Sequence, residues 1–133
     1  MDEMSDYLKN KLLNLTLNGT AFAGMNNPYV SLNTADPTPA GDLSTEVSAT
    51  GSSYVRMPAS FIVATGTSGL VDTDADTTFP AATSAWGTVS YIGLWDASIG
   101  GNMLYYTALD ASKVIDIGDV FKIAADNLTV ELS

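Results

Sequence analysis

The chain contains no cysteine and no histidine, and only five of its 133 residues are lysine or arginine. Without cysteine there is no disulfide, no thiolate nucleophile and no cysteine metal ligand, and without histidine the usual general base and the commonest zinc ligand are missing. Fifteen acidic residues give a formal net charge of −10, which opposes binding to nucleic-acid phosphates. We therefore expect no cofactor and no nucleic-acid partner.

Long apolar runs are also absent. No stretch approaches the roughly 20 apolar residues that span a bilayer, and the start of the chain, residues 1–4, is acidic where a signal peptide is basic. We expect no membrane partner and no secretion signal. Charged residues make up only 15% of the chain while 46% of it is hydrophobic, so we expect one domain over residues 1–133 whose surface is mostly small and polar.

One helix is predicted, over residues 5–18. Ser5 is a good N-cap, and Gly19 after Asn18 offers a left-handed stop. Leu8 and Leu12 fall on one stripe of this helix together with Leu15. A helix of about 13 residues is marginal alone, so we expect this stripe to dock on the body of the domain or on a neighbouring subunit.

Residues 25–133 read as short strands separated by turn-forming residues, a pattern typical of an antiparallel β-sandwich or barrel. The eight candidate strands are residues 29–34, 54–57, 60–63, 88–95, 103–107, 113–115, 120–124 and 128–132. Strand 88–95 is apolar on both faces, which indicates a central strand covered on both sides or a strand covered by a neighbouring subunit. Successive hairpins are expected in the C-terminal half, and residues 34–53 and 65–84 are expected to be long surface loops or weak ribbons.

Two groups of acidic residues were weighed as chemical sites. Asp72, Asp74 and Asp76 have the spacing that opens a calcium loop, but the glycine and glutamate that complete an EF-hand are missing, so a solvated loop is the favoured interpretation. Asp96 and Asp110 are the pair to consider for glycoside hydrolysis, although turn capping explains each aspartate better. We predict no catalytic, cofactor-binding or metal-binding residues.

Aromatic residues and the single arginine are candidates for contacts with other molecules. Trp86, Trp95 and Tyr106 could stack on sugar rings, although core packing or subunit contact explains strand aromatics more often. Arg56, alone among many carboxylates, is expected to form a bidentate ion pair, either within the fold or across an interface. With Leu8 and Leu12, these four residues are the candidate interface or glycan-contact positions.

Ten short motifs occur in an order that is more informative than any one of them. They are SDYLKNKLL at 5–13, YVSLNTADP at 29–37, TEVS at 45–48, YVR at 54–56, FPAA at 79–82, WGTV at 86–89, GLWDA at 93–97, GNMLYY at 101–106, GD at 118–119 and LTVEL at 128–132. In this order the chain resembles a family of small phage proteins described as tail-fibre-like or virion structural proteins. The resemblance implies a non-enzymatic, β-rich virion component without a cofactor, and it carries over no site residue.

These observations favour a structural protein of a tailed-phage virion, a tail-fibre or tail-tip component assembled in the bacterial cytoplasm. The expected partners are other virion proteins and further copies of the chain in a homo-oligomer. Two alternatives stay open: a capsid cement or decoration protein on the phage head, and a carbohydrate-binding module for glycans of the host surface. A glycosidase that uses Asp96 and Asp110 is a third and weaker hypothesis.

Overall fold

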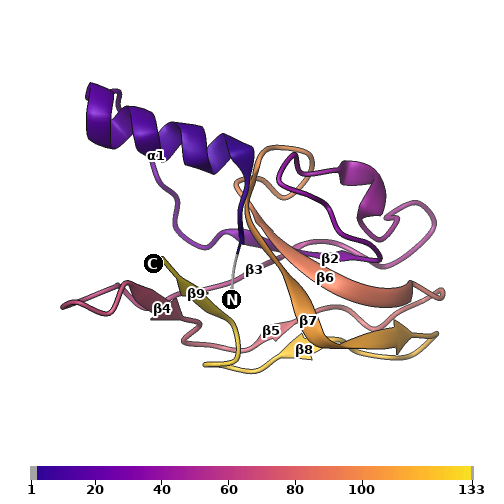
Figure 1. The fold of residues 1–133 in the computed structure, drawn as a ribbon. Coiled ribbons are helices and arrows are strands. Elements are labelled where there is room, and N and C mark those ends of the chain that lie inside the picture. The colour runs from indigo at the N-terminus through magenta and orange to yellow at the C-terminus, as the bar shows by residue number, and fades with distance from the viewer. Residues whose placement is uncertain (1–2, 133) are drawn as a thin grey trace.

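The computed structural model describes residues 3–132, so Met1, Asp2 and Ser133 lie outside the described residues. The described elements are β1 (Glu3–Met4), α1 (Asp6–Asn18), β2 (Tyr29–Asn33), the short 3-10 helix η1 (Leu43–Thr45), β3 (Met57–Pro58), β4 (Leu70–Asp72), β5 (Thr77–Thr78), β6 (Gly87–Trp95), β7 (Met103–Ile115), β8 (Lys122–Ile123) and β9 (Thr129–Glu131). The mainly β class with antiparallel sheets and an N-terminal helix is confirmed (Figure 1). Over these residues, no helix has the length and apolarity needed to cross a membrane.

Helix α1 begins and ends where its sequence predicts. The Ser5 side chain accepts a hydrogen bond from the Leu8 backbone N–H at 3.1 Å, and Gly19 closes the helix in the left-handed region with φ of 65°. Glycine adopts this conformation at little steric cost, which is why the helix stops there.

The main sheet has five antiparallel strands in the order β1-β7-β6-β2-β3. Strand β6 lies at its centre, as its two apolar faces predict, and pairs with β7 on one side and β2 on the other. Residues 103–107 and 113–115, predicted as separate strands, belong to the single strand β7, because the intervening residues continue past β6 through an irregular register. The short strand β1 pairs with Tyr105 and Tyr106 of β7.

The last two strands do not form the hairpin that the sequence predicted. Strand β8 pairs with β5, and β9 pairs with β4, so each C-terminal strand is joined to a segment about 45 to 60 residues earlier in the chain. Turn signals show where the chain reverses but do not show which strand lies alongside. Figure 1 shows the β5-β8 ribbon below the long strands β6 and β7, and the β4-β9 ribbon to their left, below helix α1.

The principal core lies between the five-stranded sheet and the two ribbons. Val30, Leu32 and Ile92 of the sheet are buried in the same cluster as Phe79 and Phe121, which flank the ribbons. The rings of Phe79 and Phe121 meet edge to face at 5.8 Å, a favoured aromatic geometry.

The structure differs from the predicted strands and loops in several details. Residues 60–63 form only an isolated bridge, Phe61 to Thr73, and the strand expected at 54–57 begins at Met57. Residues 65–84, expected to be surface loops or weak ribbons, contain the short ribbon strands β4 and β5 and also bury Phe79 in the core. Leu132, the last residue of the predicted strand 128–132, lies beyond β9, whose pairing ends at Glu131, and is 48% exposed.

Candidate functional site

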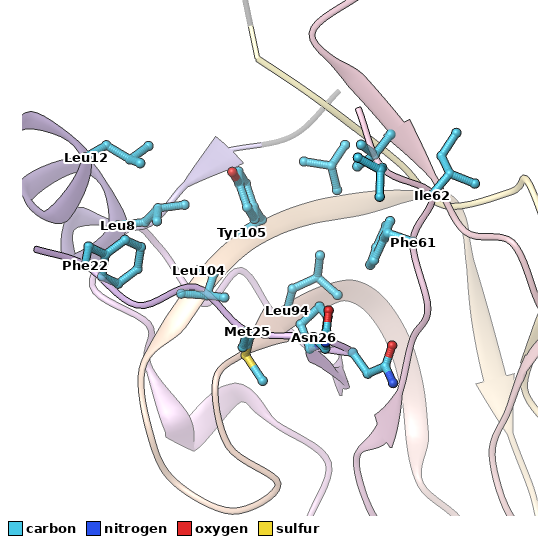
Figure 2. A pocket seen from close by; sticks show the side chains of 15 residues that line it. Leu8, Leu12, Phe22, Met25, Asn26, Phe61, Ile62, Leu94, Leu104 and Tyr105 are labelled. Atoms are coloured by element: carbon cyan, nitrogen blue, oxygen red, sulfur yellow. The ribbon is translucent and has the colours of Figure 1, made fainter. Parts of the chain in front are cut away.

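An apolar groove of about 420 Å³ separates α1 from the body of the protein. Figure 2 shows Leu8 and Leu12 on its helix side, Phe61 and Ile62 on the far side, and Tyr105 between them. The other lining residues are Phe22, Met25, Asn26, Asn27, Pro28, Val63, Val71, Leu94, Leu104 and Val130. None of the lining residues is charged, so the groove suits an apolar contact.

Helix α1 is fixed at its first turn. Ser5 is buried, its backbone N–H donates to the Leu104 carbonyl at 2.9 Å, and its hydroxyl donates to the Met103 carbonyl. Leu8 is also buried, whereas Leu12 is only half-buried. The helix is therefore attached at its N-terminal end, as Figure 1 shows, and its remaining turns project away from the sheet.

Beyond Leu12, the leucines of α1 are exposed. Leu13 is 55% exposed and Leu17 is 75% exposed, and Leu15 of the predicted docking stripe is 40% exposed. The predicted stripe therefore docks only through Leu8 and part of Leu12. A helix that is apolar on several faces and projects from its domain has the character of a segment that is covered in an assembly.

Arg56 forms the bidentate ion pair that the sequence predicts, and forms it within the fold. Its Nη2 and Nε donate to the two carboxylate oxygens of Glu46 at 2.8 and 2.9 Å. Its Nη1 donates to the carbonyls of Ala97 and Gly100 at 2.9 and 2.8 Å, and the guanidinium lies 4.0 Å from the centre of a Trp95 ring. Arg56 thus holds the loop between β6 and β7 against the loop that carries Glu46.

The same network buries a tyrosine hydroxyl. Tyr54 donates to the Glu46 carboxylate and accepts a hydrogen bond from the Leu32 backbone N–H at 3.1 Å. Burial, with the negative charge of Glu46, raises the pKa of Tyr54 far above its ordinary value, so this hydroxyl stays protonated. The arrangement is saturated with hydrogen bonds, which is characteristic of a structural clamp.

A second groove, which we call the acidic tyrosine groove, lies beside β1 and β7. It has a volume of about 460 Å³ and is lined by Glu3, Asp36, Tyr91, Tyr106, Thr107, Ala108, Leu109 and Asp110. The Tyr106 hydroxyl donates to a Glu3 carboxylate oxygen at 3.0 Å. Burial raises the pKa of Tyr106 to about 12, and the nearby carboxylates of Glu3, Asp36 and Asp6 contribute to the increase.

The two tryptophans proposed for sugar stacking lie inside the protein. Trp86 is 5% exposed and packs edge to face on Tyr54, and Trp95 is 1% exposed under the Arg56 guanidinium. Neither indole therefore offers a free face to a glycan in this structure. Tyr106 is also buried, although it borders the acidic tyrosine groove.

The acidic residues weighed as chemical sites have ordinary protein partners. Asp72 accepts a hydrogen bond from the Thr129 hydroxyl, and Asp76 accepts one from the Ala125 backbone at 2.9 Å and pairs with Lys122 at 3.3 Å. Across residues 3–132, no group of three acidic side chains is placed to hold a metal ion. Asp72, Asp74 and Asp76, which have the spacing that opens a calcium loop, therefore do not converge.

The two aspartates considered for glycoside hydrolysis, Asp96 and Asp110, lie too far apart for that reaction. Asp96 caps the turn after β6 by accepting the Asn102 backbone N–H at 2.7 Å. Asp110 lies on β7 beyond Ala108, which pairs with Tyr91, and Tyr91 lies four positions before Trp95 on β6. At about 3.3 Å per residue this separation exceeds roughly 13 Å, whereas glycosidase carboxyls lie roughly 5–9.5 Å apart.

A comparison with known protein families finds a match over nearly the whole chain. The family described as Podophage GP4 fiber I protein gp80 matches residues 3–131, which is nearly the whole chain. The chain belongs to this family. A search of curated proteins finds no match to the chain. Membership of a podophage fibre family identifies the chain as a phage structural protein, and the fold and both grooves described above are those of a fibre-family member.

Sequence reasoning missed several residues that shape this fibre-family protein. Glu46 was not recognised as the partner of Arg56, because the two lie in irregular segments ten residues apart with no periodicity to relate them. Phe61 and Ile62 belong to the predicted strand 60–63, and nothing in that pattern indicates that they line a groove opposite a helix. Glu3 and Asp36 meet at one groove only because β1 pairs with a strand about 100 residues later.

Proposed function

We propose that this fibre-family protein is a non-enzymatic structural component of a podophage tail fibre or tail tip that works as part of a multimer. The observation that carries the proposal is the family match over residues 3–131. The projecting helix α1 supports it, because exposed leucines and an uncharged groove suit lasting contact with protein. Its partners are other virion proteins and further copies of the chain, and assembly takes place in the host cytoplasm.

The polar sites of the molecule support a structural role over catalysis. The buried ion pair of Arg56 and Glu46 is satisfied within the fold, and the candidate carboxylates Asp96 and Asp110 are widely separated. Fibre-family membership favours the tail over a capsid decoration role. The burial of Trp86 and Trp95 also removes the main argument for a carbohydrate-binding module built on these rings.

The location of the protein in the particle tests the proposal. Purified virions would be analysed by quantitative mass spectrometry and by immunogold electron microscopy with an antibody to the chain. We expect a few to tens of copies per particle and label at the tail. Hundreds of copies with label over the head would support the capsid decoration alternative, and absence from the virion would refute a structural role in the particle.

A further inference from the structure

The outer face of α1 has its own chemistry, distinct from the face that lines the apolar groove. Lys9, Leu13 and Leu17 follow one another at intervals of four residues, which places them in one row along the helix. All three are exposed. Within residues 3–132, the basic side chains in ion pairs are Arg56, with Glu46, and Lys122, with Asp76. Lys9 therefore carries an unpaired positive charge at the N-terminal end of the row that continues with Leu13 and Leu17.

The acidic tyrosine groove has the opposite composition. Three carboxylates line it, those of Glu3, Asp36 and Asp110, and no lysine or arginine does. Tyr91 and Leu109 add apolar surface beside these charges. A lysine ammonium is attracted both to carboxylates and to the faces of tyrosine rings, and leucine side chains pack on apolar surface.

The two surfaces lie on different parts of the same molecule. The outer face of α1 carries Lys9, Leu13 and Leu17, and none of these residues lines the acidic tyrosine groove. The contact therefore joins two different patches. Two such contacts can form at once in a twofold dimer, and a single contact repeated head to tail forms a ring or an open filament.

We propose that the outer face of α1, formed by Lys9, Leu13 and Leu17, docks into the acidic tyrosine groove of a second copy of this chain. The argument for this occupant is charge complementarity. In a chain with net charge −10, an exposed lysine next to apolar side chains is scarce, and the groove has the carboxylates to receive it. The inference rests on the proposed fibre role, for which it identifies a partner and a surface.

Sedimentation velocity of the full chain over a range of concentrations tests the contact. Wild-type protein is expected to self-associate, and Lys9→Glu and Asp110→Lys are each expected to weaken association at least about tenfold, because each places like charges together. Combining the two substitutions in one chain restores at least part of the affinity. Lys122→Glu is the matched control, because it makes the same charge change on β8 and should leave association at the wild-type level.

The apolar half of the row is tested separately with Leu13→Gln combined with Leu17→Gln. Both side chains are exposed, so far-UV circular dichroism should be unchanged while self-association is lost. A wild-type chain that stays monomeric at all concentrations, or an equal loss of association in Lys9→Glu and Lys122→Glu, would overturn the contact. A monomeric chain that nevertheless binds a bacterial glycan, with binding lost in Asp110→Lys, would overturn it in favour of a sugar ligand.

These results are separable from the fibre role itself. If the isolated chain is monomeric but is found at the tail of purified virions, the contact between copies is refuted and the structural role stands. If the chain self-associates as described but is absent from virions, the contact stands and the structural role in the particle is refuted.

Discussion

Replacing Arg56 with methionine should unfold the protein at a markedly lower temperature. The substitution leaves the Glu46 carboxylate without its cation in a nearly buried position, where 13% of the Glu46 side chain is exposed. Removing one partner of a buried ion pair costs about 3–5 kcal/mol. We expect the low end, about 3 kcal/mol, because Glu46 keeps the hydrogen bond from Tyr54 and has some access to water.

The loss is large compared with the total stability of an ordinary domain, which is about 5–15 kcal/mol. For a chain of this length, 1 kcal/mol corresponds to about 4 °C in Tm, so Arg56→Met should lower Tm by about 12 °C. Urea unfolding followed by far-UV circular dichroism measures the free energy of unfolding. The far-UV signal is preferable to tryptophan fluorescence because Arg56 lies on the ring of Trp95, and its removal changes the emission directly.

Two further variants separate the buried pair from a general effect of charge. Arg56→Met combined with Glu46→Leu removes both charges, so it should be more stable than Arg56→Met alone, because no carboxylate is left unpaired. Lys122→Met removes the exposed pair with Asp76, in which both side chains are about half exposed, and should cost less than about 1 kcal/mol. A cost below about 1 kcal/mol for Arg56→Met, or a double variant less stable than the single one, would refute the reasoning.

Three other predictions concern packing and pH. Gly93→Ala places a Cβ 2.8 Å from the Ser31 hydroxyl and 2.9 Å from the Trp95 indole nitrogen, and urea unfolding should show a loss of about 1–3 kcal/mol in the free energy of unfolding. Gly24→Ala is the control, because its Cβ meets nothing within 4 Å and its effect on stability should be near zero. Leu8→Ala should cost about 2–5 kcal/mol and Leu17→Ala less than about 1 kcal/mol, and equal costs would contradict one-ended docking of α1. The pKa of the Tyr106 hydroxyl is about 12 in the folded protein and about 10 in the unfolded chain, so the unfolded chain loses this proton at lower pH. The contribution of Tyr106 to the free energy of unfolding is therefore fully present below about pH 10 and is lost as the pH rises toward 12. Absorbance at 295 nm during alkaline titration would show it, and complete tyrosine ionisation by pH 10.5 in the folded protein would contradict it.

Local patterns in the sequence predicted the elements whose stability is local. The caps of α1 are single residues, Ser5 and Gly19, whose preferences are strong enough to set both ends of the helix. Strand β6 was placed at the centre of the sheet because both of its faces are apolar, and a strand with that pattern needs cover on both sides.

Long-range pairing could not be predicted in the same way. Strands β4, β5, β8 and β9 contain two or three residues each, too few for an alternation to show, and their partners are chosen by the core that forms around Phe79 and Phe121. The type of contact made by Arg56 was predictable, since a lone arginine among carboxylates seeks a bidentate partner. Its partner is Glu46 because the fold brings the segment that carries Glu46 close to Arg56 and to the loop between β6 and β7, and no local sequence pattern predicts that arrangement.

The anchoring of α1 also has a consequence for how the chain is made. Ser5 caps the helix and at the same time donates to the Met103 carbonyl, 98 residues later in the chain. At a synthesis rate of about 5–20 residues per second, the first turn leaves the ribosome about 5–20 s before its acceptor exists. During that time the leucine-rich segment has nowhere to dock, and a peptide of 13 residues is too short to hold a helix by itself. The segment that carries α1 is therefore translated well before the residues that anchor it, and its first turn can dock only after Met103 and Leu104 have been made.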